Sequence, residues 1–168
     1  MQTRPTADRV KEAVFSIIQF EIEGRKVLDL FAGTGQLGIE ALSRGAEHAV
    51  FGDARREAVA LVRENLKRTR LSDRAETVQG DYLDYLSRCR QTFDVILLDP
   101  PYAEVFLETA LQKISEIDIL SDGGIIICER PAEKPHPGQF PGLSAGKDYR
   151  YGKTLVTLYR KDSHREEP

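Results

Sequence analysis

Four consecutive residues, Asp99-Pro100-Pro101-Tyr102, combine a carboxylate, a rigid backbone and an aromatic face. The prolines fix φ and remove two backbone donors, so we expect a stiff loop, although prolines can also serve only to break a strand. Asp99 and the Pro100 carbonyl can accept hydrogen bonds from an exocyclic amine of a base, which is a poor nucleophile because its lone pair is delocalised. Such bonds favour a pyramidal nitrogen and stabilise the charge that develops during attack. Tyr102 offers a flat surface for an unstacked base.

A second group of residues is suited to holding a nucleotide cofactor. Gly33, Gly35 and Gly38 follow the apolar residues 27–30 at G-x-G-x-x-G spacing. Glycine has no Cβ and permits positive φ, so the backbone N–H groups of such a turn can approach a ligand closely. Asp29, just before the turn, would repel a pyrophosphate but attract the sulfonium and α-amino groups of S-adenosylmethionine (SAM). The glycine spacing also fits an NAD site, or glycines that only allow a helix to pack on a strand.

Two further acids follow strand-like segments. Asp53 comes after residues 48–52 and can accept both ribose hydroxyls of a nucleoside, or it can be a solvated charge at a strand end. Asp81 can accept from an adenine amine, or it can cap a helix. Because the carboxyl ends of parallel strands meet at one edge of a sheet, we expect both acids to share a site with Asp29 and Asp99.

The segments that position these residues alternate between strands and helices. Apolar runs predict strands over residues 27–30, 48–52, 75–79, 93–98 and 124–128, and a hairpin over 149–160. Amphipathic patterns predict a first helix capped by Thr6 or Asp8, and further helices after the glycine turn and over 57–70, 82–88 and 104–114. In the helix over 57–70, the residues expected to face inward are Ala58, Val59, Leu61, Val62 and Leu66.

This alternation predicts an α/β fold, a doubly wound, Rossmann-like sheet of seven strands that is mostly parallel and ends in an antiparallel hairpin. We expect one domain over residues 1–161 and a polar, disordered tail over 162–168.

Composition agrees with a globular protein of the cytoplasm. Hydrophobic residues make up 40% and charged residues 30% of 168 residues. No apolar run approaches the ~20 residues that span a bilayer, and no signal-peptide core is present. The net charge of −3 does not indicate a nucleic-acid partner, although a local basic surface can still bind one. Cys89 and Cys128 are expected to be reduced thiols, and neither they nor the scattered histidines predict a metal site.

Two basic segments allow either RNA contact or a purely structural role. Arg4 and Arg9 lie at the start of the first helix, where cations interact unfavourably with the helix dipole, so they indicate either phosphate contact or a solvated helix end. The residues of the predicted hairpin turn, Tyr149, Arg150, Tyr151 and Lys153, can stack on and grip RNA, or can simply form a hairpin edge.

Several of these segments resemble one known family. Asp-Leu-Phe-Ala-Gly-Thr-Gly at 29–35 and Asp-Pro-Pro-Tyr at 99–102 resemble class I SAM-dependent amino-methyltransferases. Within that class, the opening Arg-Pro-Thr-Ala-Asp-Arg-Val-Lys-Glu-Ala-Val-Phe at 4–15 is similar to the bacterial enzymes that methylate a guanine N2 in 16S ribosomal RNA of the small subunit. Residues 37–46 and 151–154 match the same enzymes, and the resemblance covers most of residues 4–160.

The resemblance implies site residues by position. It implies that the cofactor is bound by Asp29, Phe31, Ala32, Gly33, Thr34, Gly35, Gly38, Asp53, Ala54, Asp81, Tyr82 and Asp99. It implies that the target amine is held by Asp99, Pro100, Pro101 and Tyr102, and that Arg4, Thr6, Asp8, Arg9 and Tyr102 border the substrate. The implied reaction is methyl transfer from SAM, without a metal, to 16S rRNA or the small ribosomal subunit, by a monomer.

The chain departs from this family at its start, and three rival functions also fit parts of the sequence. Family members usually carry a basic, glycine-containing segment before the Arg-Pro-Thr opening, whereas Met1 stands three residues before Arg4, and we expect this to bear on RNA affinity. A DNA adenine-N6 methyltransferase uses the same kind of amine loop. The glycine turn also suits an NAD-dependent oxidoreductase, and a non-catalytic RNA-binding module could keep the same fold.

Overall fold

The computed structural model describes residues 5–101 and 103–162, apart from the side chains of residues 5–7 and 103–105. In chain order the elements are α1 (Pro5–Ile17), β1 (Lys26–Asp29), α2 (Gln36–Ser43), β2 (His48–Asp53), α3 (Arg56–Arg68), the 3₁₀ turn η1 (Ser72–Arg74), β3 (Ala75–Gln79), α4 (Tyr82–Arg88), β4 (Phe93–Leu98), α5 (Ala103–Glu116), β5 (Leu120–Pro131), β6 (Leu143–Tyr151) and β7 (Thr154–Lys161). The α/β class predicted from the sequence is confirmed.

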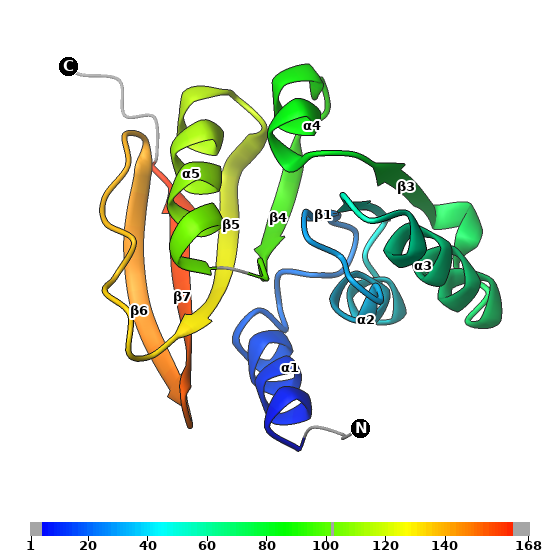
Figure 1. Ribbon diagram of the computed structural model, residues 1–168, viewed down its shortest axis with the longest axis horizontal. Coiled ribbons are helices and arrows are strands. Elements are labelled where there is room, and N and C mark those ends of the chain that lie inside the picture. Colours follow the sequence, from blue (N-terminus) through cyan, green and yellow to red (C-terminus); the bar gives the residue numbers. More distant parts are fainter. Residues whose placement is uncertain (1–4, 102, 163–168) are drawn as a thin grey trace.

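The strands form one sheet in the order β3-β2-β1-β4-β5-β7-β6 (Figure 1). The first five strands along the chain pair in parallel, and β7 pairs antiparallel with both β5 and β6. The predicted seven-stranded sheet with a terminal antiparallel hairpin is therefore confirmed. Strand order reverses between β1 and β4, and in doubly wound sheets ligands bind at such a point, beyond the carboxyl ends of the strands.

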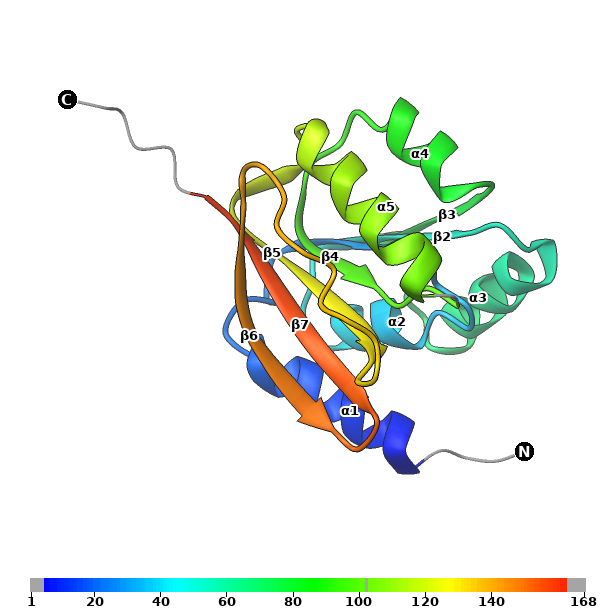
Figure 2. The same ribbon diagram turned by 60° about the vertical axis from the view of Figure 1, so that its left-hand side comes forward.

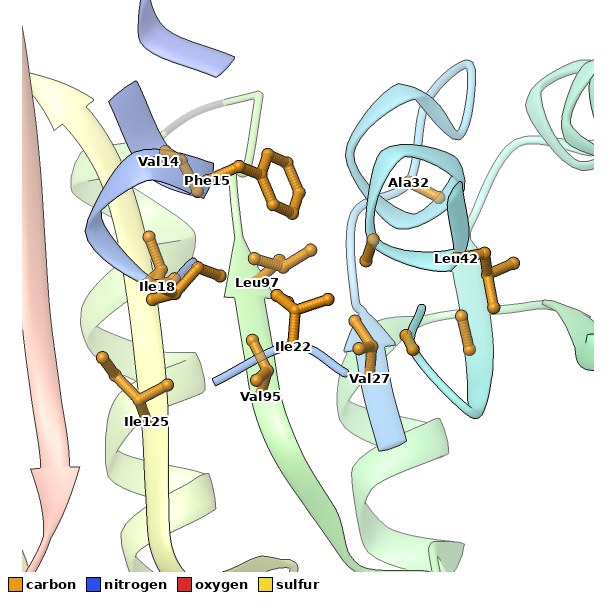
Figure 3. Packing of buried hydrophobic residues seen from close by; sticks show 14 of the residues in the cluster. Val14, Phe15, Ile18, Ile22, Val27, Ala32, Leu42, Val95, Leu97 and Ile125 are labelled. Atoms are coloured by element: carbon orange, nitrogen blue, oxygen red, sulfur yellow. The ribbon is translucent and has the colours of Figure 1, made fainter. Parts of the chain in front are cut away.

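Helices cover both faces of the sheet, with α4 and α5 on the upper face in Figure 2 and α1 and α2 on the lower one. On the lower face, Figure 3 shows Val14 and Phe15 of α1 close to Leu97 of β4, within one buried cluster that also includes Val62 of α3. On the other face, side chains of α4 and α5 pack against Leu28, Leu98 and Cys128. Parallel strands that are buried on both faces consist of nearly continuous apolar residues, and such runs allow these strands to be predicted from the sequence.

Three details differ from the sequence predictions. Helix α1 begins at Pro5, so Thr6 and Asp8 lie within its first turn and do not cap it; proline suits that position because the first N–H groups of a helix have no partner within it. Leu61 of α3 is 40% exposed, since it lies at the rim of the stripe that its neighbours bury. Strand β5 is longer than predicted, and its first residue, Leu120, pairs with Phe93 ahead of a register shift. Among the described residues, no helix has the length and apolar character needed to cross a membrane.

Candidate cofactor and substrate site

A cleft of about 500 Å³ lies at the carboxyl ends of the strands, where strand order reverses. Its wall combines the turn after β1, the ends of β2 and β3, the start of α4, the corner after β4, and α5. This volume is in the range of pockets that enclose nucleoside-sized ligands. Three of the four acids predicted to share a site, Asp53, Asp81 and Asp99, thus line one cavity, whereas Asp29 is not in its lining.

The turn after β1 takes its shape from its glycines. Gly33 and Gly35 have φ of 59° and 86°, in the left-handed region that other residues rarely adopt. Gly35 is the residue before α2, and its N–H donates to the carbonyl of Ala32 over 2.8 Å. Gly33, Ala32, Thr34 and Phe31 all line the cleft, as the predicted cofactor site requires.

Neither Gly35 nor Gly38 lines the cleft, and Gly38, the third glycine, has a packing role. A Cβ on Gly38 would come within 2.3 Å of the Phe51 ring on β2, so only glycine lets α2 pack this close to the sheet. The Gly38 N–H donates over 3.0 Å to a carboxylate oxygen of Asp29. The structure therefore makes Gly38 a packing residue that also supports Asp29.

Asp29 is buried beneath the turn, with only 1% of its surface exposed. Burial raises the pKa of Asp29 to about 7; the Gly38 N–H acts in the opposite direction, and the nearby charges of Asp99 and Asp53 raise the pKa further. Among the described residues, no fully buried side-chain oxygen lacks a hydrogen bond. The Gly38 N–H occupies one Asp29 oxygen, and the second accepts no hydrogen bond from the described part of the chain.

Asp53 connects the glycine turn to the end of β2. One of its oxygens accepts from the Gly33 N–H over 2.9 Å, and the other accepts from the backbone N–H of Arg55 over 2.9 Å and from its Nε over 3.3 Å. Asp53 lines the cleft together with Ala54 and Arg55. Asp53 thus reaches the cleft, but each of its oxygens already accepts from Gly33 or Arg55, and the ribose contact stays a prediction.

Asp81 caps helix α4, as its position before that helix allows. Its side chain accepts from the N–H groups of Leu83 over 3.0 Å and of Asp84 over 3.3 Å. Both hydrogen bonds use the same carboxylate oxygen, and Asp81 also lines the cleft. The cap therefore leaves the other oxygen for a ligand.

Three aromatic rings form the apolar wall of the cleft. The ring centroid of Phe31 lies 5.0 Å from that of Tyr82 and 6.1 Å from that of Phe106, and the last two are 5.4 Å apart. The sequence does not predict Phe106 as a cleft residue, because its helical spacing on α5 is that of an ordinary core residue. Gln36, Leu37 and Arg55, which also line the cleft, carry no sequence signal of their own.

The corner after β4 opens into the same cleft through Asp99 and Pro101, while Pro100 is buried. Asp99 remains exposed to solvent, yet the protein that surrounds this concave surface desolvates its carboxyl and raises its pKa to about 6. Tyr102 lies outside the described residues. The glycine turn and the proline corner therefore face one another across a shared space.

Of the four predicted substrate contacts in the opening segment, the two whose side chains the structure describes do not line the cleft. Asp8 and Arg9 are exposed on α1, and neither belongs to the cleft wall. Thr6 lies in the same helix with its side chain undescribed, and Arg4 lies outside the described residues. In the described part of the chain, no group of three His, Cys, Asp or Glu side chains is arranged to hold a metal ion.

Comparison with known proteins agrees with this geometry. The family described as Conserved hypothetical protein 95 matches residues 1–160. YlbH from Bacillus subtilis is 40% identical over 162 residues, which cover 95% of this chain and 88% of YlbH. Ribosomal RNA small subunit methyltransferase D from Haemophilus influenzae is 36% identical over 135 residues, which cover 79% of this chain and 70% of that protein.

The fold is shared with solved structures of similar size. The structure of yhhF from Escherichia coli matches with a TM-score of 0.88 at 26% identity, covering 98% of this chain and 92% of that one. HI0767 from Haemophilus influenzae matches with a TM-score of 0.80 at 33% identity, covering 94% and 99%. The chain therefore belongs to the Conserved hypothetical protein 95 family, a family of 16S ribosomal RNA methyltransferases.

Proposed function

We propose that this protein transfers a methyl group from SAM to the exocyclic N2 amine of a guanine in 16S rRNA, and that it acts in the cytoplasm as a monomer. The observation that carries the proposal is that the glycine turn lines the same cleft as Asp99 and Pro101 of the proline corner. Two similar relatives carry the name ribosomal RNA small subunit methyltransferase D, which supports rRNA as the substrate.

The residues around the glycine turn fit SAM better than a dinucleotide. When bound, SAM supplies a methyl group already activated by its sulfonium, so no metal and no covalent enzyme intermediate is required. Asp29 offers a buried carboxylate whose second oxygen can accept from the α-ammonium group, and ionisation of Asp29 is favoured by such a cation. Asp53 would accept from the ribose hydroxyls. Phe31, Tyr82 and Phe106 supply the apolar surface on which an adenine can lie.

The proline corner would act on the target base. Asp99 and the Pro100 carbonyl accept the two N2 hydrogens, which directs the nitrogen lone pair toward the methyl group. With a pKa of about 6, Asp99 is mostly ionised at neutral pH and can stabilise the positive nitrogen that forms as the methyl–sulfur bond breaks. The N2 proton then leaves to water, and S-adenosylhomocysteine is released. Tyr102 would stack on the flipped base.

The test compares substrates and variants with labelled SAM. Assembled small subunits lacking the modification, deproteinised 16S rRNA and duplex DNA are incubated side by side with the wild type and with Asp99→Ala. We expect label in a ribosomal substrate, no label in DNA, and SAM binding without turnover for Asp99→Ala. Label in DNA alone would replace the proposal by adenine-N6 methylation of DNA, and calorimetry that detects NADH but not SAM would replace it by an oxidoreductase.

A further inference from the structure

A carboxyl group that the proposed mechanism leaves unused lies next to the proline corner. Glu129 is on β5, one residue after Cys128, which pairs with Leu98 at the end of β4. Asp99 follows Leu98 in the same way, so Asp99 and Glu129 occupy corresponding positions on two neighbouring strands about 4.8 Å apart, Asp99 directly after β4 and Glu129 two residues before the end of β5. Glu129 is two residues beyond Ile127, and strand alternation places it on the face of the sheet that α1 covers.

Asp29 reaches the same region from the other side of β4. It pairs with Leu97, whose side chain belongs to the same buried cluster as that of Ile127. Three adjacent strands therefore carry these carboxyl groups near the point where strand order reverses: Asp29 at the end of β1, Asp99 directly after β4 and Glu129 near the end of β5. Burial raises the pKa of Glu129 to about 8, and the charges of Asp99 and Asp29 raise it further, which agrees with this proximity.

No donor among the described residues reaches the Glu129 carboxyl. The side chain is only partly exposed, yet within this part of the chain it makes no hydrogen bond and no ion pair, in contrast to Arg130 beside it, which donates to Thr157 over 2.8 Å and to Asp148 over 3.0 Å. A half-buried acid beside other acids is unfavourable unless a donor reaches it. The neighbouring side chain across β7 does not supply one, because Glu129 pairs there with Val156.

We propose that Glu129 is a specificity-determining residue that accepts a hydrogen bond from N1–H of the target guanine while Asp99 accepts from N2. This inference rests on the proposed function. The edge of guanine carries two adjacent donors, N1–H and the N2 amine, and two carboxyl groups on neighbouring strands offer the matching pair of acceptors. An adenine or a 2,6-diaminopurine has a bare N1 that would face the Glu129 oxygens as a second acceptor. A site built around a hydrogen bond rejects a base that cannot form it.

The test uses a base analogue that keeps the reacting amine. The guanosine that the wild type methylates is first mapped, and RNA is then assembled by ligation with either guanosine or 2,6-diaminopurine riboside at that position. The assay is run at about pH 8.5, above the pKa of about 8 of Glu129, because a protonated carboxyl could donate to a bare N1. Under this condition we expect the wild type to prefer the guanosine RNA in kcat/KM by roughly tenfold to a hundredfold, on the order of one missing hydrogen bond to a partly buried charged group.

Two variants isolate the role of Glu129. Glu129→Gln has an amide that can donate to a bare N1, so we expect its preference for guanosine to fall by about tenfold or more, with SAM binding unchanged by calorimetry. Glu47→Gln is the matched control. Glu47 is exposed directly before β2, at the amino ends of the strands and away from the cleft, so this variant should keep the wild-type preference.

The outcomes separate this inference from the proposed function. If the wild type methylates no guanine N2, the proposed function fails before the analogue is used. If it does, a wild-type ratio near one between the two RNAs overturns the role of Glu129, and this result needs no variant to fold. An unchanged ratio in Glu129→Gln, with normal SAM binding, also overturns it.

Discussion

Asp29→Asn should stabilise the cofactor-free protein, and by a much wider margin at pH 8 than at pH 5. The pKa of Asp29 is about 7 in the folded state, against an ordinary value of 3.8, because burial disfavours its charged form. Between about pH 4 and pH 7 the folded protein holds a proton that the unfolded chain has released, so the free energy of unfolding falls as the pH rises through this window. Asparagine never ionises and keeps an oxygen for the Gly38 N–H.

The size of the effect follows from the two pKa values. Each pKa unit is worth about 1.4 kcal/mol, so the full difference between 3.8 and about 7 corresponds to at most roughly 4 kcal/mol. Relaxation around a charged carboxylate reduces this, and we expect Asp29→Asn to exceed the wild type by about 1–4 kcal/mol at pH 8. At pH 5 the advantage should be less than half as large, at most roughly 2 kcal/mol, because only about one pH unit then separates the solution from the unfolded pKa of 3.8 while the folded Asp29 is still protonated. The same variant should bind SAM at least about tenfold more weakly, since its side chain has lost the charge that attracts the ammonium group.

Urea unfolding of both proteins at the two pH values measures the free energies, and calorimetry measures SAM binding. Asp73→Asn, in the exposed η1 turn, is a control. Its free energy of unfolding should differ from that of the wild type by the same amount at pH 5 and at pH 8. A stability difference between Asp29→Asn and the wild type that is the same at both pH values would refute the reasoning, because it would mean that Asp29 ionises in the folded state as it does in the unfolded chain.

Three further predictions concern packing and the cleft wall. Gly38→Ala should lower the free energy of unfolding by about 1–3 kcal/mol, because its Cβ meets the Phe51 ring, and adding Phe51→Leu should recover part of the loss; urea unfolding that shows no loss would contradict this. Phe106→Ala should weaken SAM binding by about tenfold in calorimetry, because it removes one ring of the apolar wall, and an unchanged affinity would exclude Phe106 from the cofactor site. Asp148→Leu should cost about 3–5 kcal/mol, because it leaves the buried guanidinium of Arg130 without its charged partner; adding Arg130→Met should restore part of the stability, and a double variant no better than the single one would argue against the ion pair as the cause.

Much of the sheet could be predicted from residue patterns because its inner strands are buried on both faces. The segments around Val50 and Ile96 are continuous apolar runs, and each ends in an acid that leads toward the cleft. The start of β5 could not be predicted in this way. Ser121, Asp122, Gly123 and Gly124 are typical of a turn, and they join a strand only because Leu120 pairs with Phe93 at a register shift.

The site was predictable where a residue's chemistry is local and unpredictable where it depends on neighbours in space. The glycine turn and the proline corner carry their function in consecutive residues. Phe106 lines the cleft because α5 follows the corner, and Gly38 is required because Phe51 lies beneath it. The position of Glu129 beside Asp99 follows from the pairing of β4 with β5, which a single sequence does not contain.

The most direct test of the account identifies the methylated nucleoside. Small ribosomal subunits that lack the modification are incubated with the wild-type protein and SAM, and their 16S rRNA is digested and analysed by mass spectrometry. The account predicts N2-methylguanosine at one position, and its absence from a parallel reaction with Asp99→Ala. N6-methyladenosine, or a methyl group that Asp99→Ala transfers as well as the wild type does, would contradict it.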